Sequence, residues 1–122
     1  MNDRPQPMEK PMTFEEKALA SHQELMARID GMSEEEKTAW SEFGMPGYLD
    51  RLKEFQPNRI SSVTGFEIDL GNCVDHWRGR QWQESKEHEE LLNVLWKVPT
   101  KEDRDTRYQE VKRKYYMQRG WT

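Results

Sequence analysis

Four short patterns in this chain each mark the beginning of a helix. In each, a serine or threonine stands three residues before an acidic residue. The hydroxyl and the carboxylate can then accept the backbone N–H groups that a first helical turn leaves without partners. Apolar residues follow at intervals of three and four, the spacing of one helical face. The four pairs are Thr13 with Glu16, Ser33 with Glu36, Thr64 with Glu67, and Thr100 with Asp103.

Glycine and proline indicate where these helices end and where others begin. Two further apolar stripes, after Pro46 and from about residue 83, predict two more helices, and residues 57–64 are the one break in the helical rhythm. No strand-like alternation persists along the chain. The sequence therefore predicts an all-α fold, a small bundle of about five or six short helices. The predicted stops are Gly31, Gly44, Pro57, Gly79, Pro99 and Gly120.

The N-terminal residues differ from the rest of the chain. Residues 1–12 hold three prolines and few apolar side chains, a composition typical of a flexible tail. The remaining length suits one domain. We predict a flexible tail at 1–12 and a single helical domain at 13–122.

The composition predicts a thin core. Apolar residues make up 34% of the chain and charged residues another 34%, and the seven glycines raise the apolar share to roughly 40%, below the about 45–50% of typical domains. Five tryptophans, four tyrosines and four phenylalanines offset this, because each aromatic ring buries a large area. Such a chain would gain stability from a protein partner or from a second copy in a homo-oligomer.

Charge and cysteine content limit the partners and the cellular location that we expect for this chain. The net charge of −4 argues against a general nucleic-acid binder, whose domains are usually basic. The single cysteine cannot form an intrachain disulfide, which favours a reducing, cytoplasmic location. No apolar run has the length of a membrane span, and the first residues lack the apolar stretch of a signal peptide. We expect a soluble intracellular protein with no membrane partner.

Residues that could carry catalysis or bind a metal do not form a known motif. Cys73, His76 and His88 are fewer than the ligands that zinc prefers. The pairs Glu84/Glu87 and Glu102/Asp105 could instead hold magnesium beside a nucleotide, as in all-α pyrophosphohydrolases. A solvated helix face explains the same spacing. Glycine-rich phosphate loops and a nucleophile elbow are absent. We therefore predict no cofactor and no metal site. The sequence favours a protein that is not an enzyme without deciding the question.

The stretch from Gly65 to Gln83 contains a row of apolar residues at helical spacing, followed by a basic segment. Phe66, Leu70, Cys73, Val74 and Trp77 share one helical face. We expect them to be buried together, facing Leu91, Leu95 and Trp96 of the following helix.

A helix end at Gly79 would place Arg78, Arg80 and Trp82 in a short connection. Loops on a rigid scaffold often carry contacts, and an arginine-flanked tryptophan is typical of interface anchors. Trp82 could equally fold back as a lid on a small core. Of the C-terminal aromatic residues, Tyr108 and Tyr115 follow the apolar stripe. The predicted partner-binding residues are Arg78, Arg80, Trp82, Lys112, Arg113, Tyr116 and Trp121.

The segment "DLGNCVDHWRGRQWQESKEHEELLNVLWKV" resembles the core of a small phage-encoded family of uncharacterised domains, which includes a small nucleotide kinase of phage T7. Positions 70–74 and 89–96 carry the match, and Ser21, His22, Ile29 and Asp30 resemble an upstream motif. Asp75 and His76 stand where the family has a Lys-Tyr pair. The resemblance implies a phage origin, and the aspartate would repel a phosphate that such a lysine binds.

Together these observations predict a small interaction protein, a phage or accessory factor that binds and modulates a larger protein. Two alternatives remain. One is a magnesium-dependent nucleotide-handling enzyme, a kinase or a pyrophosphohydrolase. The other is a structural subunit of a multi-protein assembly.

Overall fold

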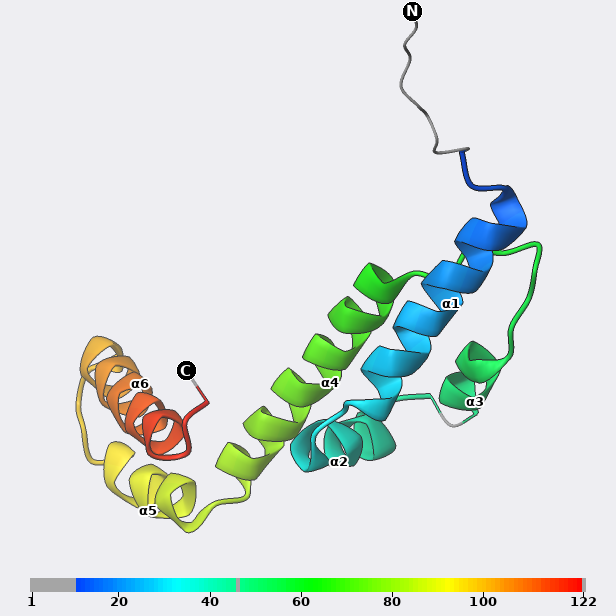
Figure 1. Cartoon of the computed structure of the whole chain (residues 1–122). Coiled ribbons are helices and arrows are strands. Elements are labelled where there is room, and N and C mark those ends of the chain that lie inside the picture. The colour runs from blue at the N-terminus through cyan, green and yellow to red at the C-terminus, as the bar shows by residue number, and fades with distance from the viewer. Residues whose placement is uncertain (1–10, 46, 122) are drawn as a thin grey trace, which may run out of the picture. The chain divides into compact units, whose positions relative to one another are not determined.

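The computed structural model describes residues 11–45 and 47–121, which form six helices and no strand. The all-α fold is therefore confirmed (Figure 1). Most of the predicted tail, residues 1–10, lies outside the described residues. The helices are α1 (Phe14–Asp30), α2 (Glu34–Phe43), α3 (Tyr48–Lys53), α4 (Val63–Gln83), α5 (Lys86–Leu95) and α6 (Lys101–Gln118).

The first two helices begin with the predicted capping boxes. The Thr13 hydroxyl accepts the Glu16 N–H at 3.1 Å, and the Thr13 N–H donates to the Glu16 carboxylate at 2.8 Å. Ser33 and Glu36 repeat this reciprocal pair at 3.1 and 2.9 Å. Thr100 caps α6 through its hydroxyl, which accepts the Asp103 N–H. Three of the four Ser/Thr–acid pairs therefore stand at the helix starts that they predict.

Helix α4 departs from the prediction at both ends. Its first turn is capped by Ser62, whose hydroxyl accepts the Gly65 N–H at 3.0 Å, so the pair Thr64/Glu67 does not open it. The predicted stop at Gly79 is wrong, because α4 continues to Gln83. Glycine inside a helix costs only about 1 kcal/mol. The burial of Trp82, one turn further on, outweighs that cost.

The described chain divides into two compact units at a boundary inside α4, between Val74 and Asp75. In the first unit, Arg28 of α1 pairs with Glu36 of α2 at 2.6 Å and with Glu67 of α4, which ties three helices together. The prediction of a single domain over 13–122 stays a prediction. The buried apolar residues of the first unit are Ala18, Leu25, Ile29, Met32, Ala39, Trp40, Phe66, Leu70, Cys73 and Val74.

The second unit has a separate cluster of buried residues, formed by Trp82, Leu91, Leu95 and Tyr115. We expected Leu91 and Leu95 to be buried with the apolar stripe that begins at Phe66. That expectation is wrong, because Leu91 and Leu95 belong to the cluster around Trp82. Trp96, expected in the core, is 73% exposed, and Trp77 is half-buried.

No helix in the described part of the chain is both long enough and apolar enough to cross a membrane.

Candidate protein-binding surface

Trp82 is the centre of the second unit. It is 1% exposed, and its indole N–H donates to the Tyr108 hydroxyl at 2.9 Å. Its ring also meets those of His88 and Tyr115, with centroids 5.0 and 5.2 Å away. The Tyr115 hydroxyl donates to the Gln81 carbonyl at 3.2 Å. Each buried ring thus satisfies its polar atom, which makes a tryptophan acceptable in a small core.

The end of α6 turns back on itself and places Trp121 over the helix. Gly120 has φ +70°, a left-handed conformation that is cheap without a Cβ. The Gly120 N–H donates to the Met117 carbonyl and the Trp121 N–H to the Tyr116 carbonyl, at 3.1 and 3.0 Å. These two bonds are those of a Schellman motif, which ends a helix by satisfying its last carbonyls.

Four residues form what we call the C-terminal cluster: Trp77, Arg78, Tyr116 and Trp121. The Trp121 ring lies 5.7 Å from Trp77 and 5.4 Å from Tyr116, centroid to centroid. The Arg78 guanidinium lies 5.5 Å from the Trp121 centroid and donates to the Trp121 carbonyl at 3.4 Å. All four side chains are half-buried, so the cluster holds the chain end and presents only its edges.

Tyr116 is a neutral member of this cluster. Burial raises the pKa of its phenol, and the Asp75 carboxylate raises the pKa further, while Arg78 acts in the opposite direction. The Lys112 ammonium lies 5.7 Å from the centre of the Tyr116 ring. The phenol therefore keeps its proton at neutral pH and remains a hydrogen-bond donor.

The predicted partner-binding residues other than Trp82 divide into two groups. Arg78, Lys112, Tyr116 and Trp121 are half-buried in or beside the C-terminal cluster. Arg80 and Arg113 are exposed, and Arg80 pairs with Glu84 at 3.2 Å.

The prediction for the position of Trp82 is wrong. This residue does not lie in a connection between helices. It lies in the last turns of α4 and fills the core, so the lid interpretation describes its packing better than the surface interpretation.

The most exposed aromatic side chain in the described residues was assigned to the core by the sequence pattern. Trp96, 73% exposed, lies one turn after Leu92, which is 49% exposed. The Lys97 ammonium lies 5.4 Å from the Trp96 ring centroid. The sequence spacing shows two adjacent rows, Leu91 with Leu95 and Leu92 with Trp96, but it does not say which of the two rows is buried.

Three of the four candidate magnesium carboxylates lie close to a cation. Glu84 pairs with Arg80, Asp105 pairs with Lys101 at 3.6 Å, and Glu87 lies 3.7 Å from Arg119. Within residues 11–45 and 47–121, no three His, Cys, Asp or Glu side chains gather closely enough to share a metal ion. The described residues therefore assemble no magnesium site from these pairs.

Cys73 is also poorly placed for nucleophilic chemistry. It is buried, and burial raises the pKa of its thiol, to which the Asp69 carboxylate adds. A protonated thiol is a weak nucleophile.

A scan against protein-family models, a search of curated proteins and a search of solved structures each returned no match. The resemblance to the phage-encoded family stays a prediction.

Proposed function

We propose that this chain is a small helical interaction protein that binds and modulates a larger protein through its second unit. The observation that carries the proposal is the exposure of Trp96, the C-cap residue of α5, one turn after the exposed Leu92. A large apolar side chain that is three-quarters exposed on a unit with few apolar residues favours a contact role over a packing role.

Tryptophan is well suited to such a contact. It is enriched among the residues that dominate binding energy at interfaces, where a ring enters a pocket and excludes water. The Lys97 ammonium over one side of the Trp96 ring adds a polar neighbour, which fits an apolar anchor with a polar rim. Leu92 extends the apolar contact by one helical turn.

The nucleotide-handling alternative receives no support from the arrangement of carboxylates, because Glu84, Glu87 and Asp105 each have a cation close by. The structural-subunit alternative also requires binding to a larger protein and differs from the proposal in the effect of that binding on the partner's activity. A subunit would bind without changing the activity of its partner.

The test is affinity capture from cells of the source organism with the wild-type chain, Trp96→Ala, and Ile68→Ala as a matched control. Ile68 is 60% exposed and belongs to the first unit, so its removal deletes a similar exposed apolar side chain elsewhere. We expect one protein to be lost with Trp96→Ala and kept with Ile68→Ala. The activity of that protein should change when the purified wild-type chain is added.

Equal capture by all three chains would contradict a role for Trp96. Hydrolysis or phosphoryl transfer by the purified chain, measured over a nucleoside triphosphate panel with magnesium, would favour the enzyme alternative. A captured protein whose activity does not respond would favour the structural subunit.

A further inference from the structure

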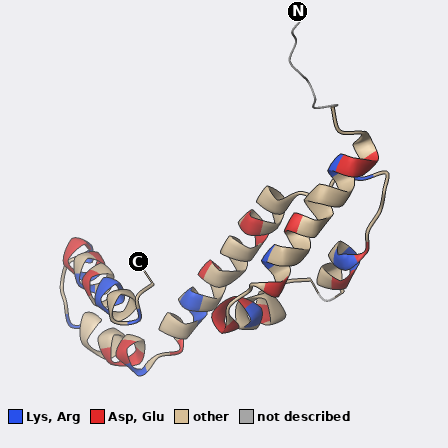
Figure 2. Cartoon of the chain, viewed as in Figure 1, with Lys and Arg blue, Asp and Glu red and all other residues tan. Residues whose placement is uncertain are grey.

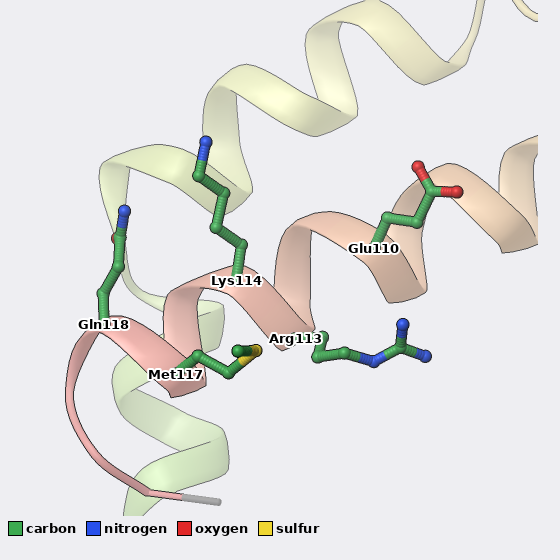
Figure 3. Close-up of a pocket in the computed structure, with 5 residues that line it drawn as sticks. All are labelled: Glu110, Arg113, Lys114, Met117 and Gln118. Atoms are coloured by element: carbon green, nitrogen blue, oxygen red, sulfur yellow. The ribbon is translucent and has the colours of Figure 1, made fainter.

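We infer that the outer face of α6 binds an acidic segment of a protein partner, an inference that rests on the proposed function and names the chemistry of a second contact. The outer face is the side of α6 that carries Glu110, Arg113, Lys114, Met117 and Gln118, which line a shallow open depression. Figure 3 shows these five side chains projecting from α6. The opposite side of the helix carries Tyr108, Val111 and Tyr115, which pack on the core.

The cations of this face have no internal partner. Most basic side chains of the second unit are engaged: Arg80, Lys101 and Arg119 in ion pairs, Arg104 in a hydrogen bond to Val98, and Lys97 and Lys112 over aromatic rings. Within the described residues, Arg113 and Lys114 make no ion pair, and neither does Arg107, one turn before Glu110. Three exposed and unpaired cations on one helix are a site for carboxylates.

Met117 gives the face an apolar contact. Its side chain is 61% exposed and lines the same depression as Arg113 and Lys114. An unbranched thioether adapts its shape to different apolar partners. An exposed methionine beside two unpaired cations favours a segment that offers an apolar side chain between carboxylates.

The charges along α6 favour an acidic protein over a nucleic acid. Figure 2 shows acidic residues at the beginning of α6 and basic residues further along it. Glu110 lies inside the depression itself, and Glu102 and Asp103 occupy the first turn. A continuous phosphate backbone following the helix would meet these carboxylates. A short acidic segment confined to the second half of α6 would meet Glu110 as the one carboxylate of α6 beside it, and would complement Arg113 and Lys114.

The probe is a synthetic fluorescent peptide in which leucines at helical spacing are separated by glutamates. Binding is measured with the purified full chain by fluorescence anisotropy, and its location by amide chemical-shift changes. We expect the shifts to centre on Arg113, Lys114 and Met117. The double change Arg113→Glu with Lys114→Glu should weaken binding by about tenfold or more, because charge-assisted contacts become repulsive.

Two controls separate this face from general charge. Lys86→Glu alters another exposed cation of the second unit and should leave the affinity unchanged. Met117→Ser should weaken the binding of the peptide with leucines and leave the binding of a peptide of glutamates alone unchanged. Circular dichroism should show unchanged helix content for all variants, since these side chains are exposed.

Three results would overturn the inference: equal binding of a glutamine-for-glutamate peptide, tighter binding of duplex DNA than of the peptide, or self-association that covers α6 and is abolished by the double change. A failure here leaves the Trp96 capture result intact, because that experiment uses a different helix and a different variant. Loss of the Trp96 effect with peptide binding kept would instead contradict the proposed function alone.

Discussion

The two compact units solve the problem of a small core in different ways. Most buried apolar residues of the first unit are aliphatic or small, among which Ala18, Leu25 and Ala39 are 0% exposed and Leu70 is 1% exposed, and its buried apolar rings are Trp40 and Phe66. The second unit buries Trp82 and Tyr115 beside two leucines. Its rings satisfy their polar atoms through the Tyr108 hydroxyl and the Gln81 carbonyl. A core in which a tryptophan and a tyrosine are half of the buried residues therefore depends on specific hydrogen bonds, whereas a core made mostly of aliphatic and small side chains depends on close helix packing.

The surfaces of the two units differ as well. Residues 1–74 carry 14 acidic and 8 basic side chains, whereas residues 75–122 carry 9 acidic and 11 basic ones. In the first unit, the partly buried Arg28 forms ion pairs with Glu36 and Glu67. The second unit leaves cations on α6 without partners. This difference supports the proposal that the second unit makes the contacts with a partner.

Removal of Trp82 should have the largest effect on stability. Trp82→Ala deletes the largest fully buried side chain and leaves the Tyr108 hydroxyl without its donor. We expect a loss of about 3–5 kcal/mol in the free energy of unfolding of the second unit, measured by urea denaturation. Loss of partner capture without loss of stability would instead restore Trp82 to a binding role.

Leu70→Ala should destabilise the first unit by about 2–5 kcal/mol, because the site is closed and a cavity remains. Hydrogen exchange can separate the units: we expect faster exchange in α1 and α2, with α5 and α6 still protected. Equal acceleration of exchange in all helices would show that the two units unfold together.

The pairing of Glu36 predicts a pH effect confined to the first unit. The Arg28 guanidinium holds the pKa of the Glu36 carboxyl below its ordinary value, and the Ser33 backbone N–H adds to this. A lowered folded-state pKa gives stability that is present above the ordinary carboxyl pKa of about 4.3 and is lost as the pH falls through the folded value. At neutral pH, the free energy of unfolding of the wild type should exceed that of Glu36→Gln by about 1 kcal/mol.

That advantage should shrink in acid below about pH 4. Thermal unfolding at several pH values checks it, with Glu24→Gln, an exposed position on α1, as the control. A difference between wild type and Glu36→Gln that does not change with pH would mean that the pair contributes by geometry alone.

Gly79→Ala gives the smallest effect and tests the course of α4. Gly79 lies inside the helix, and a Cβ there would approach only the Tyr116 hydroxyl, at 4.0 Å. Alanine should therefore stabilise the second unit by about 0.5–1 kcal/mol, measured as a higher midpoint of urea denaturation. Destabilisation would indicate a left-handed residue and a helix that ends there.

Local signals in the sequence determined most helix starts. The hydroxyl and carboxylate of a capping box act within one turn, so Thr13, Ser33 and Thr100 could be identified without knowledge of any distant contact. The same holds for the turn at Gly31, which follows α1 directly. The all-α class follows from these signals and from the spacing of the apolar residues.

Only the tertiary structure decided where α4 ends and which residues of the second unit are buried. A glycine stops a helix or continues it according to the packing that follows, and the burial of Trp82 lies beyond any local pattern around Gly79. Leu91, Leu92, Leu95 and Trp96 occupy two neighbouring rows of α5, and periodicity cannot say which row meets a partner helix. The boundary at Val74, the choice of Trp82 over Trp96 for the core, and the unpaired cations of α6 all depend on which side chains meet in space, because burial and ion pairing are properties of neighbours and not of residues.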